Sequence, residues 1–182
     1  MIITITGRMG SGKDTVVKLL DIPRNYKIID ADAIGHDLLG DHHIIRQIKE
    51  FFPTAIENQV VNRSTLAQLV FPNQVKILNN IMHSAMIARI KSMATGNAII
   101  NAALLDELEI KKMSDKIVFV STSTDETVAR LKDKFSKLDI LNRLNTQNPI
   151  SWYNSQSDIT IENNGSIEDL KKELAKKCQN LF

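Results

Sequence analysis

A glycine-rich stretch near the N-terminus constrains the fold more than any other feature of this sequence. The run "GRMGSGKDT" begins at Gly7 and directly follows "MIITIT", an apolar and β-branched run at residues 1–6. Its Gly7, Gly12 and Lys13 match the phosphate-binding pattern G-x-x-x-x-G-K-[ST], whereas Asp14 stands at the hydroxyl position. Because that pattern functions where a buried strand turns into a helix, it predicts a parallel α/β sheet with an anion site at its edge.

Four further apolar runs predict the other strands of this sheet. They occupy residues 27–30, 97–102, 116–121 and 158–163. Helical patterns separate these runs, so we expect a five-stranded parallel sheet with helices on both faces, the three-layer α/β arrangement of P-loop NTPases. Ligands of such folds bind beyond the carboxyl ends of the strands.

The length and composition suit one domain, because 182 residues with 43% hydrophobic side chains can bury a single core. We expect a single P-loop domain over residues 1–182. Its core would comprise residues 1–32, 95–130 and 158–182. The helical stretch at about residues 33–94 is too long for a simple crossover, and we interpret it as an inserted acceptor-binding region. The polar segment at about residues 131–157 is interpreted as a short lid.

Capping signals predict where several helices begin and end. Asp41 and Ser166 are predicted N-caps, and Pro72 is expected to end a short helix. Ser123 and Glu126 have the spacing of a capping box, in which each side chain would bond the other residue's backbone N–H.

The charge and cysteine content exclude several functional classes. The net charge of +2 gives no preference for a polyanion or a membrane surface. No nucleic-acid partner is expected either, because the lysines near the C-terminus are not interleaved with aromatic residues. The single cysteine, Cys178, excludes an internal disulfide and a cysteine-based zinc site. No apolar run has spanning length and no signal-peptide pattern occurs, so we expect a cytoplasmic protein.

The residue types of the loop fit a bound polyphosphate. Gly7, Gly10 and Gly12 allow backbone N–H groups to converge on an anion, where a Cβ would block the approach. Lys13 is expected to reach the β- and γ-phosphates, and Thr15 the α-phosphate. The loop therefore predicts a nucleoside triphosphate as ligand.

Asp14 has two interpretations. A Ser or Thr hydroxyl at this position normally ligates Mg²⁺, and a carboxylate is also a hard oxygen ligand. Its negative charge near a triphosphate is unfavourable unless Mg²⁺ or Lys13 lies between them. Alternatively, Asp14 is a first-turn helix residue that the helix dipole favours.

Two further carboxylates follow the second predicted strand, in "IIDADAIGHDLL". Asp30 and Asp32 are two residues apart, so in an extended chain their side chains point the same way, at the edge that carries the phosphate loop. We assign to Asp32 the orientation or deprotonation of an acceptor hydroxyl, and to Asp30 the binding of metal-bound water. The alternative is that one of them simply caps the next helix.

With these residues, the chain resembles the dephospho-coenzyme A kinase family, on the P-loop nucleoside-monophosphate kinase fold. The resemblance follows six segments in order, namely "GSGK", "IDAD", "NRSTLAQLVF", "LNNIMHSAMI", "AALLDE" and "DITIENNGSIEDL". The loop alone is shared by many enzymes, but the ordered set is much more specific. The resemblance implies phosphorylation of the ribose 3′-hydroxyl of dephospho-coenzyme A, the last step of coenzyme A synthesis, with ATP as donor and Mg²⁺ as metal.

The resemblance also implies roles for residues on the donor side. Asn164 and Gly165 would lie beside the adenine. The residues that would bind the ATP phosphates are Gly10, Ser11, Gly12, Lys13, Asp14 and Thr15.

On the acceptor side, the resemblance implies that Asp32 is the acceptor carboxylate and that His83 and Glu107 contact the acceptor. Arg143 and Gln147 resemble the lid segment R-x-x-x-Q, in which the arginine would be catalytic. Outside this pattern, His83 would be interpreted as an ordinary histidine on a helix surface.

The sequence departs from the family pattern at several positions. Asp14 replaces a Ser, His36 stands where many members carry Arg, Ser84 replaces a Pro, and the lid has few arginines. Fewer arginines mean less charge compensation for the transferring phosphoryl group. Two alternative functions therefore stay open. "GKDT" suggests a (deoxy)nucleoside monophosphate kinase, and Asp14 with the arginine-poor lid suggests a non-catalytic nucleotide-binding module.

Overall fold

The computed structural model describes residues 1–71 and 73–182. Its centre is one parallel sheet of five strands in the order β2-β5-β1-β6-β7, which confirms the predicted α/β fold. The strands are β1 (Ile2–Thr6), β2 (Lys27–Asp30), β5 (Ala98–Asn101), β6 (Lys116–Ser121) and β7 (Ile159–Glu162). Because β1 is central, the loop that follows it opens at the middle of the sheet's carboxyl edge.

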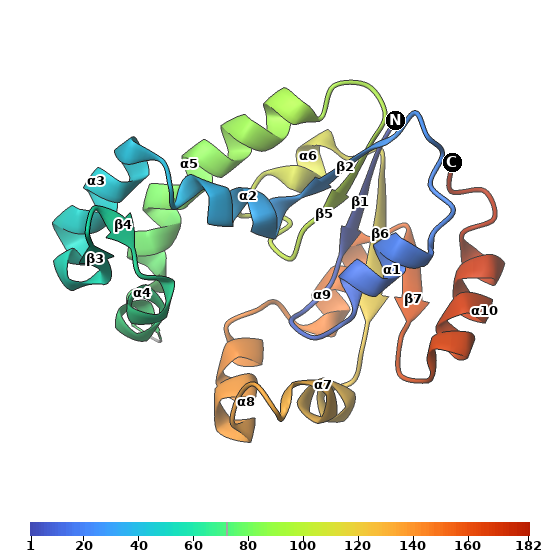
Figure 1. Cartoon of the computed structure of the whole chain (residues 1–182). Helices are drawn as coiled ribbons and strands as arrows, with labels where there is room; N and C mark the ends of the chain where they lie inside the picture. The colour runs from blue at the N-terminus through green and yellow to red at the C-terminus, as the bar shows by residue number, and fades with distance from the viewer. Residues whose placement is uncertain (72) are drawn as a thin grey trace.

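Ten α-helices accompany the sheet in the described residues. They are α1 (Lys13–Leu19), α2 (Ala31–Leu38), α3 (His42–Phe51), α4 (Arg63–Val70), α5 (Val75–Met93), α6 (Ile110–Met113), α7 (Thr124–Leu131), α8 (Lys137–Asn145), α9 (Ile150–Gln156) and α10 (Ile167–Lys177). In Figure 1, α7 and α8 lie beyond the carboxyl ends of the strands, whereas both chain termini lie near the opposite end. None of the helices in this part of the chain is both long and apolar enough to cross a membrane.

Two hydrophobic clusters cover the two faces of the sheet. Neighbouring residues of β5 divide between them, because successive side chains of a strand point to opposite faces. Ile99 packs in the cluster that contains Val16 of α1 and Leu170 of α10. Ile100 packs in the larger cluster that contains the apolar faces of α2 to α5. The inserted helices therefore share a continuous core with the sheet.

The predicted insertion also contains a hairpin that the sequence analysis did not identify. Strands β3 (Ile56–Glu57) and β4 (Val60–Val61) pair antiparallel, and in Figure 1 they lie with α3 and α4 far from the central sheet. Asn58 and Gln59 form the turn with φ of 50° and 65°, the left-handed conformation that a two-residue hairpin turn requires. With two residues in each strand, the alternation is too short to stand out in the sequence.

The predicted N-caps at Asp41 and Ser166 are confirmed, but the predicted capping box at Ser123 is only half formed. The Ser123 hydroxyl accepts a bond from the Glu126 N–H, as expected. The Glu126 carboxylate, however, pairs with Arg130 one turn along α7. The Ser123 N–H instead donates to the side chain of Asn164, at 2.8 Å. The expected helix stop at Pro72 lies outside the described residues.

The segment predicted as a lid contains a helix that packs on the sheet. In α9, Tyr153 is buried and stacks on Phe119 of β6, with 5.0 Å between ring centroids and 9° between ring planes. This contact anchors the C-terminal part of the segment, so α8 is the part that stands away from the sheet.

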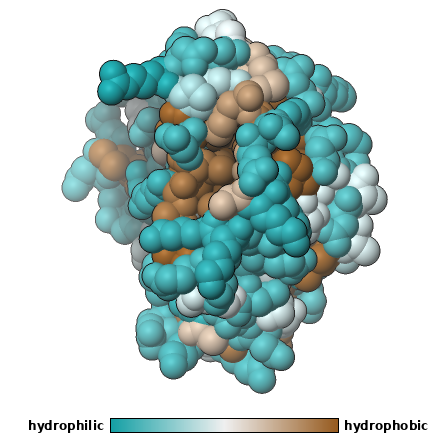
Figure 2. Space-filling view, turned by 90° about the vertical axis from the view of Figure 1, so that its right-hand side faces the viewer, coloured by the Kyte–Doolittle hydropathy of each residue, from teal (hydrophilic) through white to brown (hydrophobic). Residues whose placement is uncertain are grey.

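The face that carries α10 shows apolar surface at its centre (Figure 2). A hollow of about 390 Å³ lies between α1 and α10 and is lined by Leu19, Leu20, Leu174 and Phe182, among others. Cys178 also lines it as a half-buried free thiol, and burial raises its pKa.

The edge strand β2 provides a matched test of the core. Ile29 is 0% exposed and its neighbour Ile28 is 55% exposed. We expect Ile29→Ala to lower the free energy of unfolding by about 2–5 kcal/mol, through lost apolar burial and the cavity that is left. Ile28→Ala loses the same β-propensity but little burial, and should cost about 1 kcal/mol or less. Urea unfolding followed by circular dichroism measures both, and equal losses would contradict the assigned faces.

Candidate active site

The phosphate loop connects β1 to α1 in the conformation that its glycines predict. Gly10 and Gly12 have φ of 72° and 88°, and Gly12 is the N-cap of α1. A Cβ on Gly12 would also lie 2.5 Å from the Asn163 side-chain nitrogen, so the close packing of the loop itself requires glycine there. The first backbone N–H groups of a helix lack acceptors within it, so α1 directs donors at the space before Lys13.

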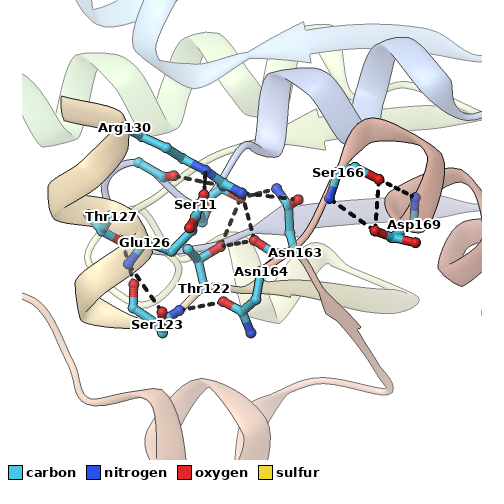
Figure 3. Close-up of polar contacts among 11 residues, drawn as sticks. Ser11, Thr122, Ser123, Glu126, Thr127, Arg130, Asn163, Asn164, Ser166 and Asp169 are labelled. Atoms are coloured by element: carbon cyan, nitrogen blue, oxygen red, sulfur yellow. Dashed lines mark hydrogen bonds and ion pairs between the residues drawn. The ribbon is translucent and has the colours of Figure 1, made fainter.

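The carbonyl groups of the loop are held by residues from two neighbouring strand ends and from α7 (Figure 3). The Ser11 carbonyl accepts bonds from Asn163 Nδ2 at 2.7 Å and from the Thr122 hydroxyl at 3.2 Å. Arg130 donates to the Gly10 and Ser11 carbonyls at 3.4 Å each, and to the Asn163 carbonyl at 2.8 Å. These contacts hold the Gly10 and Ser11 carbonyls in place behind the loop.

These three supporting residues were not predicted from the sequence as site residues. Thr122 and Asn163 directly follow β6 and β7, so their position at the carboxyl edge of the sheet was a usable signal. Arg130 gave no such signal, because it lies on the last turn of α7 and reaches the loop only through the tertiary fold. It is also paired with Glu126 at 3.0 Å, which holds its guanidinium in place.

The two residues predicted to lie beside the adenine have different surroundings in the structure. Gly165 lines a hollow of about 340 Å³ together with Gly12, Thr15 and Arg130. Asn164 is not among the residues that line it. The Asn164 side chain instead accepts the bond from Ser123 N–H and donates to Glu162.

Asp14 lies in the first turn of α1 and contacts the end of β5. Asn101 is the last residue of β5, and its Nδ2 donates to Asp14 Oδ1 at 2.7 Å. Asn101 is 6% exposed, and its side-chain oxygen is buried without a hydrogen-bond partner among the described residues. The sequence analysis did not identify Asn101, although a polar residue that ends the apolar run "AIIN" was a signal.

The expected arrangement of Asp30 and Asp32 is wrong, because the chain is not extended across both residues. Asp30 ends β2 and α2 begins at Ala31. The Asp30 carboxylate caps that helix, since its Oδ1 accepts a bond from the Ala33 N–H at 2.9 Å. Asp32 lies in the first turn of α2 with an exposed side chain. The register pairs Asp30 with Asn101, so Asp30, Asn101 and Asp14 follow one another along the sheet edge.

The donor set at this edge fits Mg²⁺ only together with phosphate oxygens. Within residues 1–71 and 73–182, no group of three or more His, Cys, Asp or Glu residues could hold a metal ion. Two carboxylates belong to this edge: Asp14 accepts a bond from Asn101, and Asp30 is the register partner of Asn101 on β2. Mg²⁺ is usually held by one or two carboxylates, by substrate phosphates and by water. The residues present therefore fit a nucleotide-bound Mg²⁺ and not a metal bound by protein alone.

The candidate site has a second cavity, besides the hollow of about 340 Å³ beside Gly12. It has a volume of about 420 Å³ and lies between the phosphate loop, the insertion and the predicted lid. Met9 contributes from the loop, and Glu107 lies beyond β5. The residues that line it from the insertion and the lid include Phe71, Val75, Leu78, Arg143, Thr146 and Gln147. Two bonds join α8 and the residues after it to the loop. The Met9 N–H donates to Gln147 Oε1 at 3.0 Å, and the Arg8 guanidinium donates to the Leu144 carbonyl at 2.6 Å.

Arg143 lies between two aromatic rings. Its guanidinium carbon is 4.4 Å from the centroid of Phe71 and 4.8 Å from that of Phe135. Phe71 follows α4 and Phe135 precedes α8, so this cation–π contact joins the insertion to the predicted lid.

His83 is half-buried near the middle of α5. Burial lowers its pKa from the ordinary value of 6.5, and the negative charge of Glu107 acts in the opposite direction. The structure thus brings His83 and Glu107 within electrostatic range of each other. Glu107 lines the second cavity, but His83 is not among its lining residues.

The sequence model of the dephospho-CoA kinase family matches residues 1–169. The chain belongs to the dephospho-CoA kinase family. This family of transferases catalyses the final step of coenzyme A biosynthesis, with ATP as phosphate donor.

Relatives match this chain over nearly all of its length. The dephospho-CoA kinase of Helicobacter pylori is 30% identical, over 99% of this chain and 97% of its own. Among solved structures, TT1252 from Thermus thermophilus superimposes with a TM-score of 0.76 at 28% identity, over 97% of this chain and 95% of its own. The dephospho-CoA kinase of Campylobacter jejuni gives 0.70 at 22% identity, over 99% and 96%, and supports the shared fold.

The environment of His83 leads to a titration prediction. Because burial disfavours the imidazolium, the folded protein should bind this proton more weakly than the unfolded chain. This residue therefore lowers stability as the pH falls below about 6.5. An NMR titration should give His83 a pKa below 6.5. In Glu107→Gln the value should fall further, since the opposing charge is gone. A pKa at or above 6.5, or an unchanged value in that variant, would contradict this environment.

Proposed function

We propose that this protein transfers the γ-phosphoryl group of ATP to the ribose 3′-hydroxyl of dephospho-coenzyme A, with Mg²⁺ as the metal. The observation that carries the proposal is the phosphate loop, whose Ser11 carbonyl is held by Asn163, Thr122 and Arg130 in a chain that its family matches almost throughout. The bonds to the Gly10 and Ser11 carbonyls support the loop, which would reduce the cost of ordering it around the phosphates of ATP.

On the donor side, the loop N–H groups and Lys13 would hold the phosphates of ATP. Lys13 begins α1, and its ammonium group would compensate the charge that develops on the transferring phosphoryl group. Thr15 and Gly165 line the hollow on the other side of Gly12, which we assign to the nucleoside end of ATP. This assignment keeps Gly165 beside the adenine, whereas the Asn164 side chain is bonded to Ser123 and Glu162.

On the acceptor side, Asp32 would accept the proton of the attacking hydroxyl. It lies in the first turn of α2, two residues after the end of β2. Its exposed carboxylate has no hydrogen-bond partner among the described residues, so it is free to contact a substrate. Glu107 and His83 would bind the acceptor farther along. The cavity of about 420 Å³ that Glu107 lines has room for part of the acceptor.

When bound, Mg²⁺ would neutralise negative charge shared between the β- and γ-phosphates. Asp14 and Asp30 are the residues that would hold it or its water shell. The Asp30 Oδ1 already caps α2, which leaves Oδ2 for that purpose.

Arg143 is proposed as the lid arginine that approaches the transferring phosphoryl group. It lines the same cavity as Met9 of the phosphate loop, and α8, which carries it, is joined to the loop by Arg8. The arginine count near the site is thus larger than the lid alone suggests, since Arg8 and Arg130 approach from outside the predicted lid.

Two alternatives can be separated from this proposal by one experiment. A (deoxy)nucleoside monophosphate kinase would consume ATP with dAMP, dGMP, dTMP or AMP, and a non-catalytic module would bind ATP without turnover. A coupled ATP-consumption assay with dephospho-coenzyme A and with each monophosphate decides among the three. Turnover with a monophosphate but not with dephospho-coenzyme A would overturn the proposal. An absence of turnover with every acceptor would overturn it as well. The cytoplasmic location stays a prediction.

Lys13→Ala should remove turnover without unfolding the protein. Its side chain is partly exposed at the loop mouth, so the core does not depend on it. Without the Lys13 ammonium group, the negative charge that develops on the transferring phosphoryl group is less well compensated. This loss is expected to lower kcat by about 10²–10³-fold or more. Lys18→Ala, in the last turn of the same helix and exposed, is the matched control. Activity of Lys13→Ala within a few-fold of wild type, with an unchanged thermal melt, would rule out this loop as the catalytic phosphate site.

Asp32→Asn should lower kcat far more than it raises the KM for ATP. Asn keeps the shape but cannot accept the hydroxyl proton, and general-base catalysis contributes about 10²–10⁴-fold. Asp37→Asn, also exposed on α2, is the control and should behave as wild type. Steady-state kinetics with both substrates varied give the two parameters. A change confined to ATP affinity would place Asp32 on the donor side.

A further inference from the structure

The contact between Asp14 and Asn101 has a fixed chemical direction. A carboxylate can only accept hydrogen bonds, so the amide NH₂ of Asn101 faces Asp14 and its oxygen points the other way. That oxygen is buried and has no partner within the described residues, although a buried polar atom normally has one. The pair is therefore oriented, and it presents an unused oxygen at the sheet edge next to the phosphate loop.

P-loop NTPases in general hold Mg²⁺ with two residues of different charge. A Ser or Thr hydroxyl follows the loop lysine, and an aspartate comes from the strand side of the site. Here the residue after Lys13 is the carboxylate, Asp14, and the strand residue in contact with it is the neutral amide, Asn101. The two chemical types have changed places.

We propose that Asp14 and Asn101 form an exchanged pair, in which the negative charge of the Mg²⁺ site has moved from the strand end to the loop. In this pair, Asn101 is a positioning residue that holds the Asp14 carboxylate toward the nucleotide phosphates. The inference rests on the proposed function, because it assigns the metal side of the same site.

The charge balance at the sheet edge explains why the exchange must involve both positions. Asn101 lies between two carboxylates, since it donates to Asp14 and pairs in register with Asp30. An aspartate at position 101 beside Asp14 would place two negative charges at hydrogen-bond distance, an arrangement that disfavours the charged forms. A serine at position 14 beside Asn101 would leave the pair without charge. A pair with one carboxylate and one neutral side chain carries a single negative charge, whichever of the two positions holds the carboxylate.

Four proteins test the exchange: wild type, Asp14→Ser, Asn101→Asp and the double variant Asp14→Ser/Asn101→Asp. Calorimetric titration with ATP, in saturating Mg²⁺ and in EDTA, gives the factor by which Mg²⁺ strengthens ATP binding. No acceptor and no turnover are needed. A thermal melt of each protein checks that it is folded.

The factor should follow the charge of the pair and not the position of the carboxylate. It should be smallest in Asp14→Ser, where the pair is neutral, and at least about tenfold larger in wild type. The double variant has the same charge as wild type, so its factor should return to within about threefold of the wild-type factor. Such a recovery would show that the two positions are coupled, because the effects of independent sites add. In EDTA, ATP should bind most weakly to Asn101→Asp, where two negative charges face the phosphates.

A double variant that stays folded and has the small factor of Asp14→Ser would overturn the proposal. So would equal factors in wild type and Asp14→Ser, which would mean that Asp14 points away from the nucleotide. If Asn101→Asp does not fold, Asn101→Ala takes its place: it should lower the Mg²⁺ factor in wild type but not in the Asp14→Ser background. A loss of equal size in both backgrounds would show that Asn101 has only a structural role. Failure of wild type to bind ATP at all would instead refute the proposed function.

Discussion

The site depends on the bonds that hold the backbone of the phosphate loop from behind. A short loop with several glycines has high conformational entropy, and binding an anion with it would be costly if the loop were free. Asn163 and Thr122, at the ends of β7 and β6, and Arg130 on α7 together fix the Ser11 carbonyl. These bonds therefore hold the loop backbone from one side. In the proposed function, this support would lower the entropic cost of ordering the loop around a phosphate group.

The same edge organises the rest of the chemistry. The register places Ile5, Asn101 and Asp30 side by side across β1, β5 and β2, so the loop, the amide and the carboxylate share one line. The insertion and α8 are joined by the contact of Arg143 with Phe71, and both line the cavity of about 420 Å³ beside the loop. In the proposed function, the loop would form the donor half of the site and this cavity part of the acceptor half.

Much of the fold was predictable because its signals are local. The β-branched runs gave all five strands of the central sheet within about two residues, since buried parallel strands are continuous apolar segments. Asp41 and Ser166 were predictable as caps because capping is decided within one helical turn. The half-formed box at Ser123 failed for a nonlocal reason. Asn164, far along the chain, took the N–H that Glu126 was expected to bond.

The sequence by itself determined the phosphate loop, the order of strands and helices, and the family, because glycine spacing and hydrophobic period are written along the chain. Only the tertiary structure decided which polar groups meet. Asp14 meets Asn101 across 87 positions, and Arg130 meets the Ser11 carbonyl across 119, and no local pattern records either contact. The direction of Asp32 was likewise decided by the turn into α2 at Ala31, where capping by Asp30 overrides the extended chain. Local chemistry therefore specified the elements, and the packing of distant strand ends specified the site.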